Sequence, residues 1–308
     1  MRIVAENLSY VYSEKSKTLA VQALKGVSLT VESGEFFGIV GKTGSGKSTF
    51  VQHLNGLIRV GKDKGSLKVG EFDLTDKKCD YKALRAKVGM VFQYPEYQLF
   101  AETVSDDVGF GLKNFMPELS EKEREERIKT AVELVGLDYE KIKEKSPFEL
   151  SGGQKRRVAI AGVIVTRPEI LVLDEPAAGL DPQGRREFIE LLHKLHQGFV
   201  KTIIIVSHDM NLISENCGRA AVFSGGKIVA VGTPAEIFSE EYDGVREGLD
   251  LPVTEYVTRA LKRAGITLSS DLTVKGFIAA AENAAAKSAE KREGTAAGRT
   301  RGGTGEEE

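Results

Sequence analysis

The sequence is poor in cysteine and contains no long apolar run. Its two cysteines, Cys79 and Cys217, show neither a disulfide pattern nor the spacing of a metal site, which favours a reducing compartment. No apolar run approaches the roughly 20 residues that a membrane-spanning helix needs. The opening residues 1–6 do not read as a secretory signal peptide. We therefore expect a cytosolic protein that reaches a membrane only through a partner.

Neither sign of charge is in excess. The chain carries 43 basic and 45 acidic residues, and this balance argues against nucleic-acid binding and against a polybasic membrane anchor. With 308 residues, the chain is long enough for one large α/β domain with an appendage, or for two small domains.

A glycine-rich loop is the most informative stretch. Residues 41–49 read GKTGSGKST and fit the phosphate-binding pattern G-x-x-x-x-G-K-[ST]. The apolar run 36–40 predicts a buried strand before the loop, and apolar residues at helical spacing follow it. The pattern alone predicts a phosphate site and leaves GTPases, kinases and ATPases open. The predicted phosphate-binding residues are Gly41, Lys42, Thr43, Gly44, Ser45, Gly46, Lys47, Ser48 and Thr49.

The chemistry of this loop assigns two roles. Glycines let backbone N–H groups turn toward a phosphate, and the start of a helix adds partial positive charge. We expect Lys47 to reach the β- and γ-phosphates and Ser48 to hold Mg²⁺.

Two carboxylates follow a second apolar strand. Residues 170–173 are aliphatic, and Asp174 and Glu175 come directly after them. Ligands gather at the carboxyl ends of strands in open parallel sheets. We expect Asp174 to hold Mg²⁺ through a water and Glu175 to polarise a water for attack on the γ-phosphate.

The third motif, LSGGQKRR at residues 150–157, resembles the signature of ATP-binding cassette (ABC) ATPases. Further motifs of that family follow in the same order: Gln93 after the predicted strand 87–92, AGLDP at residues 178–182, and His208 after the predicted strand 202–206. The resemblance covers about residues 2–235 and implies an α/β P-loop NTPase cassette. Such a cassette has a RecA-like parallel sheet core, an antiparallel β subdomain and an α-helical signature subdomain, here at about 94–166. No internal repeat is visible, so we expect a single cassette.

The resemblance implies ATP and Mg²⁺ as cofactors and a site shared by two chains. The ATP bound to the glycine-rich loop of one chain would be clamped by four residues of the other chain, namely Ser151, Gly152, Gly153 and Gln154. Gln93 would contact Mg²⁺ and the attacking water, His208 the γ-phosphate, and Asp181 the opposite site. Tyr12 would stack on adenine, with Tyr10 as the alternative. The other histidines, at positions 53, 193 and 196, are read as structural or surface residues.

Two segments indicate which subfamily of the ABC ATPases the chain resembles. Residues 94–100 (YPEYQLF) and 146–162 are similar to the ATPases of energy-coupling-factor (ECF) transporters, in particular the second, A-prime subunit. That family implies a heterodimer with a second homologous ECF ATPase, a transmembrane coupling protein and a membrane substrate-binding subunit, at the cytoplasmic face of a bacterial membrane. The resemblance further implies that ATP hydrolysis by this assembly powers uptake of vitamins or transition-metal ions. Tyr97, Leu99 and Phe100 are read either as exposed side chains that face the coupling protein or as ordinary packing of the helical subdomain, and the sequence favours neither.

Other readings fit less well. A chromosome-maintenance ATPase needs a long coiled coil before Ser151, and sustained heptads are missing. A ribosome-associated ABC protein normally has two cassettes in one chain. A non-hydrolysing subunit is disfavoured by Glu175 and His208. The ATPase of a conventional importer or exporter remains the alternative.

Further elements follow from local patterns. A capping box at Ser120–Glu123 starts a helix that Gly136 ends. Another buried helix begins near Ser151 and ends near Val165. A hairpin spans 219–231, with its turn at residues 225–226. Residues 236–290 are predicted to be a helical extension that contacts the partner ATPase, with helices at 254–264 and 274–290. Residues 291–308 are predicted to be disordered.

Overall fold

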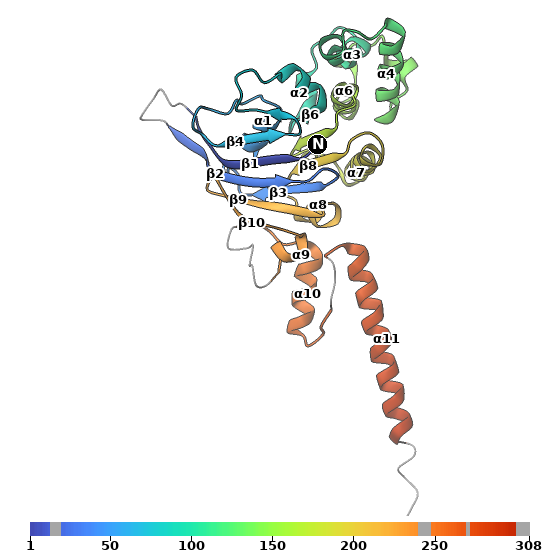
Figure 1. Cartoon of the computed structure of the whole chain (residues 1–308). Helices are drawn as coiled ribbons and strands as arrows, with labels where there is room; N and C mark the ends of the chain where they lie inside the picture. Colours follow the sequence, from blue (N-terminus) through green and yellow to red (C-terminus); the bar gives the residue numbers. More distant parts are fainter. Residues whose placement is uncertain (13–19, 240–247, 269–271, 300–308) are drawn as a thin grey trace, which may run out of the picture.

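The computed structural model describes residues 1–12, 20–239, 248–268 and 272–299, with side chains up to residue 286. A six-stranded sheet in the order β10-β9-β3-β8-β7-β6 forms its centre (Figure 1). Neighbours from β9 to β6 run parallel, and β10 pairs antiparallel with β9. The strands are β3 (Phe36–Gly41), β6 (Val88–Val91), β7 (Ile170–Asp174), β8 (Thr202–Val206), β9 (Arg219–Ser224) and β10 (Lys227–Gly232). The predicted parallel core is confirmed.

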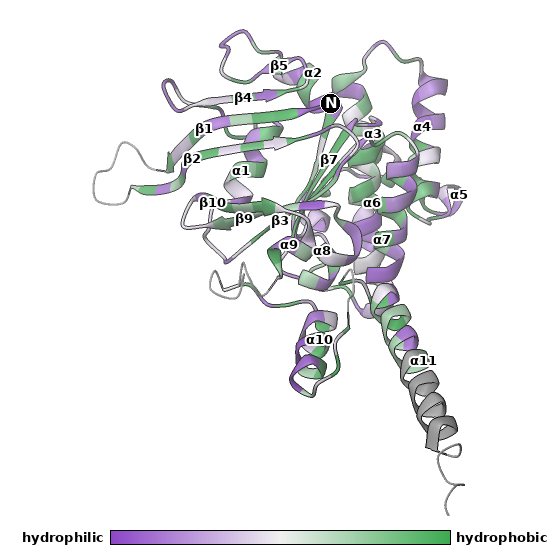
Figure 2. Cartoon of the chain, turned by 60° about the horizontal axis from the view of Figure 1, so that its bottom comes forward, coloured by the Kyte–Doolittle hydropathy of each residue, from purple (hydrophilic) through white to green (hydrophobic). Residues whose placement is uncertain are grey.

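Both faces of this sheet are buried. In β3, Phe36 and Val40 pack on one side and Phe37 and Ile39 on the other, because successive side chains of a strand alternate. Strands covered on both faces read as continuous apolar runs. Figure 2 shows this contrast, with β7 hydrophobic and the outer helix α4 (Glu121–Leu134) largely hydrophilic.

A four-stranded antiparallel sheet in the order β2-β1-β4-β5 forms a second layer. Its strands are β1 (Ile3–Tyr12), β2 (Val21–Val31), β4 (Ser66–Val69) and β5 (Phe72–Asp73). The predicted antiparallel subdomain is therefore confirmed. The helix after the glycine loop, α1 (Lys47–Leu54), is shorter than the apolar spacing predicts. It ends before Leu57 and Ile58, because the chain turns at Gly56 with a φ of +67°.

The predicted helical subdomain is also confirmed. It follows α2 (Tyr81–Lys87) and β6, and α3, α4 and α6 lie together at one end of the molecule (Figure 1). Its further elements are η1 (Pro95–Gln98), α3 (Val104–Phe115), α5 (Tyr139–Ile142), η2 (Pro147–Glu149) and α6 (Gly152–Ile164). Ser120 and Glu123 form the predicted capping box of α4, and Gly136 follows its end with a φ of +77°.

Helices α7 (Pro182–Gln197), α8 (Met210–Asn216) and α9 (Pro234–Ile237) complete the core. Helix α7 buries an apolar face, which consists of Phe188, Leu191, Leu192 and Leu195. The β9–β10 hairpin turns at Gly225 and Gly226 as predicted, with φ values of +54° and +87°.

The C-terminal helices α10 (Val253–Arg263) and α11 (Val274–Arg299) extend away from the two sheets (Figure 1). Leu249 and Leu251 anchor this part by burial in the main core. Helix α11 continues beyond the predicted end at 290, so the prediction of a disordered tail is wrong for residues 291–299. Lysine, arginine, glutamate and alanine supply six of these nine residues and favour helix, whereas Gly294, Thr295 and Gly298 do not. Residues 300–308 lie outside the described part. Within that part, no helix is long and apolar enough to cross a membrane.

Candidate functional site

The glycine loop joins β3 to α1 in a conformation that only glycine fits. A Cβ atom on Gly41 would lie 2.2 Å from the Phe223 carbonyl oxygen, and one on Gly46 would lie 2.5 Å from that of Ala23. Both glycines have positive φ, +146° and +105°. Gly46 caps α1 without a side chain, so the first N–H groups of this helix have no side-chain acceptor. The loop therefore presents backbone donors to an anion.

Lys47 lies at the centre of this loop. Its Nζ donates to the carbonyl oxygens of Gly41 at 2.7 Å and Lys42 at 3.0 Å. Burial lowers the pKa of Lys47, and the charges of Glu175 and Asp174 oppose this shift. A buried ammonium group held this way is positioned to receive a phosphate oxygen.

Asp174 and Ser48 form the second part of the site. Asp174 ends β7 and is 8% exposed. Burial raises its pKa, while a hydrogen bond from the Ser48 hydroxyl and the charge of Lys47 work in the opposite direction. Carboxylate and hydroxyl oxygens suit Mg²⁺, which usually keeps water and substrate phosphates among its ligands. No cluster of three or more His, Cys, Asp or Glu side chains that could hold a metal occurs among the described residues, so a cation here would need such added ligands.

Glu175 and His208 contact each other. The Nδ1 atom of His208 lies 2.8 Å from Oε2 of Glu175, and the His208 backbone N–H points at the same oxygen from 3.4 Å. Glu175 has a left-handed backbone with a φ of +50°, and its N–H donates to the Val206 carbonyl at 2.9 Å. Non-glycine residues with such strained backbone cluster at functional sites. The sequence assigns separate roles to these two residues and does not indicate their contact.

These groups line one cavity of about 460 Å³. It brings together residues of both sheets: Tyr12, Val21, Gln22, Ala23, Thr43, Gly44, Gly46, Lys47, Ser48, Thr49, Gln93, Asp174, Glu175 and His208. Most of the predicted site residues are among them. Val21, Gln22 and Ala23 were missed, because a strand edge carries no motif.

The structure separates the two tyrosines considered for the same role. Tyr12 lines the cavity with 39% exposure, and its hydroxyl lies 3.2 Å from that of Thr49. Tyr10 packs against the core beside His53, with ring centroids 5.1 Å apart. Tyr12 is therefore the ring that a ligand in the cavity can contact.

Several predicted residues lie outside the lining of this cavity. Ser151 caps α6 by accepting from the Gln154 N–H at 3.3 Å, and the Gln154 side chain accepts from the Ser151 N–H at 3.1 Å. A Cβ atom on Gly152 or Gly153 would meet no atom within 4 Å. Asp181 caps α7 by accepting from the Gly184 N–H at 2.8 Å. The signature segment is thus exposed, and it does not line the cavity beside the glycine loop of its own chain.

Two loop residues turn away from the cavity. A Cβ atom on Gly248 would lie 1.6 Å from Cε of Lys42, so the Lys42 side chain rests on the C-terminal segment. The Ser45 hydroxyl is buried and has no hydrogen-bond partner in the described part of the chain. Lys42 therefore contributes to the loop through its backbone carbonyl.

The structure separates the three residues that were read as either exposed or packed. Tyr97 and Phe100 are 83% and 60% exposed, whereas Leu99 is 6% exposed and packs in the main core. Asp107 explains the difference, because its carboxylate accepts from the backbone N–H groups of Phe100 at 2.8 Å and Ala101 at 2.9 Å. These bonds fix the chain after η1 with Leu99 directed inward.

The other histidines have structural contacts, as predicted. His53 is fully buried, and its Nδ1 lies 2.7 Å from the Thr49 carbonyl oxygen. His193 contacts Asn216 at 2.8 Å, and His196 contacts the Lys201 carbonyl oxygen at 2.9 Å.

Comparison with known proteins matches residues 24–178 to the ABC transporter family. The energy-coupling factor transporter ATP-binding protein EcfA2 of Clostridium tetani is 46% identical over 272 residues, which cover 88% of this chain and 93% of that protein. EcfA2 of Latilactobacillus sakei is 45% identical over 267 residues, covering 86% and 90%.

Solved structures of ABC transporter cassettes are also similar to this chain. That of cbiO1 from Clostridium perfringens, described as part of the ABC transporter complex cbiONQ, has a TM-score of 0.67 and 36% identity over 83% of this chain and 98% of its own. The cassette MJ0796, a dimer bound to ADP and Pi, has a TM-score of 0.66 and 29% identity over 75% and 98%.

Proposed function

Because this chain belongs to the ABC transporter family, and within it to the energy-coupling factor ATP-binding proteins, we propose that it is the A-prime ATPase of an ECF importer. In this role, ATP hydrolysis powers uptake of vitamins or transition-metal ions. The observation that carries the proposal is the convergence of Lys47, Asp174 and Glu175 on one cavity beside the glycine loop.

We assign the phosphates of ATP to the loop at residues 41–49. Lys47 and the uncapped start of α1 favour an anion there. Mg²⁺ would be held by Ser48, Gln93 and, through a water, Asp174, whose oxygens fit its ligand preference. When bound, the metal neutralises charge that develops on the phosphate oxygens.

Glu175 acts as the general base that takes a proton from the attacking water. The contact from His208 to Oε2 orients the carboxylate, and Oε1 would face that water. His208 is also 75% exposed at the cavity, so its ring can contact the γ-phosphate and stabilise developing charge. Tyr12 stacks on adenine, which its exposed ring beside Thr49 supports.

We further propose that each ATP is shared by two chains. Ser151, Gly152, Gly153 and Gln154 form an exposed helix start outside their own cavity, which suits an anion bound to another chain. Asp181, at the start of α7, would face the opposite site. ATP then holds the dimer closed, and hydrolysis releases it.

The partner is a second, homologous ECF ATPase, so the dimer is a heterodimer. We divide the chain into a cassette of residues 1–235 and an extension of residues 236–290. Helix α10 of this extension supports a contact to that partner. It buries Thr254 and Glu255 but leaves Val253, Tyr256 and Val257 exposed. An amphipathic helix with a free apolar face suits a protein interface.

The helical subdomain at about 94–166 would receive a transmembrane coupling protein. Tyr97 on η1 and Phe100, whose ring contacts that of Phe110 on α3, are exposed aromatic side chains, a type that is frequent in interface hot spots. The assembly would place this chain at the cytoplasmic face of the bacterial membrane, together with a membrane substrate-binding subunit.

Purification of the native complex from membranes tests this function. We expect Mg²⁺-dependent ATPase activity, a second cassette protein and a coupling membrane protein in the same complex. A complex built around a periplasmic-type binding protein would instead identify a conventional importer.

A further inference from the structure

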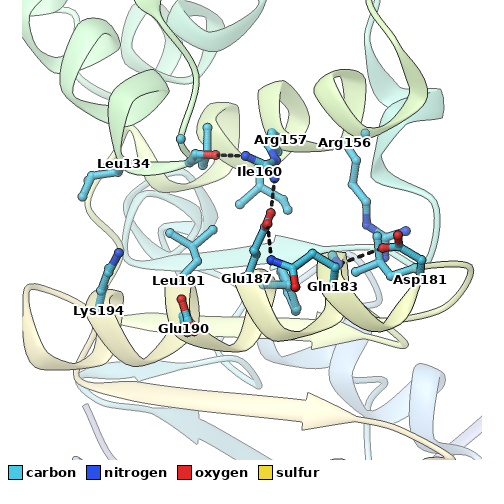
Figure 3. A pocket seen from close by; sticks show the side chains of 16 residues that line it. Leu134, Arg156, Arg157, Ile160, Asp181, Gln183, Glu187, Glu190, Leu191 and Lys194 are labelled. Carbon is cyan, nitrogen blue, oxygen red and sulfur yellow. Dashed lines mark hydrogen bonds and ion pairs between the residues drawn. The ribbon is translucent and has the colours of Figure 1, made fainter.

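Arg156 connects the signature helix to the loop that carries Glu175. It lies on α6, two residues after Gln154, and is 7% exposed. Its Nη1 donates to the Ala178 carbonyl oxygen at 2.9 Å, and its Nη2 donates to that of Pro176. In Figure 3 the Arg156 side chain reaches from α6 toward Asp181 at the start of α7. One buried guanidinium group thus holds two carbonyls of the loop between Glu175 and Asp181.

Besides these bonds, the loop is held by packing of Ala177 and Leu180 against the core and by its own turns. Glu175 has a left-handed backbone, and the following turns rest on long bonds from Ala178 N to the Glu175 oxygen at 3.2 Å and from Leu180 N to the Ala177 oxygen at 3.3 Å. Charge-assisted bonds from a guanidinium group are stronger than neutral ones. The position of α6 therefore influences where this loop lies.

A carboxylate faces the same guanidinium from a third segment. Burial lowers the pKa of Arg156, and the charge of Glu96 opposes this shift. Glu96 lies on η1, three residues after Gln93. Its Oε2 and the Arg156 Nε are both buried without a hydrogen-bond partner in the described part of the chain. The charge of Arg156 therefore interacts with a carboxylate on the segment after Gln93, while its hydrogen bonds join the signature helix to the Glu175 loop.

Beside Arg156, a cavity separates part of α6 from α7. Arg156 lines a cavity of about 470 Å³ enclosed by the end of α4, α6 and α7 (Figure 3). The next residue, Arg157, spans this cavity at another point, where it pairs with the half-exposed Glu187 on α7 at 2.5 Å. Arg157 joins the same two helices without touching the Glu175 loop.

We propose that Arg156 is a positioning residue that sets the Glu175 loop according to the position of the signature helix. A nucleotide bound by Ser151–Gln154 would in this way influence the Glu175 carboxylate of the same chain, at the other site. The inference rests on the proposed function for its consequence in hydrolysis. The dependence of residues 176–181 on Arg156 is a structural claim, and it can be tested without measuring ATP turnover.

The test compares Arg156→Met, Arg156→Lys and the control Arg157→Met in the full native complex. Arg156→Met should lower kcat about tenfold or more, because small displacements of a catalytic group are costly. ATP affinity, measured by calorimetry, should change less than about threefold, since Arg156 does not line the nucleotide cavity. Arg156→Lys should be intermediate, because lysine lacks the planar fork. Arg157→Met should stay within about twofold of the wild type, as expected for an exposed pair.

Hydrogen exchange supplies a readout apart from activity. Amides of residues 177–181 should exchange faster in Arg156→Met and Arg156→Lys, with residues 41–49 unchanged. Unchanged exchange at 177–181 in Arg156→Lys, equal loss of kcat in Arg156→Met and Arg157→Met, or a parallel loss of ATP affinity would overturn the proposal. A wild-type complex without ATPase activity would refute the proposed function instead, while the exchange data would still decide the role of Arg156.

Discussion

Replacement of Lys47 by methionine tests the phosphate site most sharply. The change keeps the length of the side chain and removes the ammonium group that lies between the Gly41 and Lys42 carbonyls. A hydrogen bond to a charged group contributes about 1.5–3 kcal/mol, so ATP should bind roughly 10- to 150-fold more weakly. The free energy of unfolding should change much less, because burial of this ammonium is itself unfavourable, as its lowered pKa indicates.

The same loop supplies a matched control. Lys42 carries the same charge, but its side chain rests on Gly248 and does not line the cavity. Calorimetric titration with ATP should therefore give a dissociation constant within about threefold of the wild type for Lys42→Met, because only an exposed charge is lost. If Lys42→Met weakens ATP binding as much as Lys47→Met, or if neither variant weakens it, the assignment of Lys47 to the phosphates is refuted.

Further predictions concern other residues. Glu175→Gln should keep ATP binding but reduce steady-state turnover about 100-fold or more, as expected for loss of a general base, and should retain a closed dimer in gel filtration; wild-type turnover would contradict it. Asp174→Asn should stabilise the nucleotide-free chain at neutral pH in urea unfolding, because its folded pKa is raised and the ionised form is therefore unfavourable when buried. In the wild type, Mg²⁺-dependent ATP affinity should fall as pH drops through this raised pKa, and a pH-independent affinity would disprove the metal role. Leu99→Ala should cost about 2–5 kcal/mol of unfolding free energy, whereas Tyr97→Ala should leave stability unchanged and weaken co-purification of the coupling protein.

The sequence predicts those parts of the fold that depend on local patterns. Residues 170–173 and 202–206 read as strands because both faces of the sheet are covered. The loop at 41–49 carries its glycines where the backbone requires them. The capping box at Ser120 and the turn at Gly225 follow the same logic, since their signals lie within a few residues.

Contacts between distant segments could not be predicted in the same way. The approach of His208 to Glu175 depends on the parallel register that places Asp174 opposite Val206. Arg156 gives no sign in the sequence that its guanidinium reaches the carbonyls after Glu175. The sequence left open whether Leu99 is exposed or packed, because the acceptor that directs it inward, Asp107, belongs to another helix.

The central claim, that each ATP is clamped between two chains, is tested most directly by Ser151→Arg. Arginine at this exposed helix start would block contact with the phosphates of the ATP bound to the partner's glycine loop. The nucleotide cavity of the same chain would not be altered. ATP hydrolysis is then measured for each site of the reconstituted pair. The account predicts that this chain still binds ATP while hydrolysis at the partner's site is lost. Undiminished hydrolysis at the partner's site would contradict it.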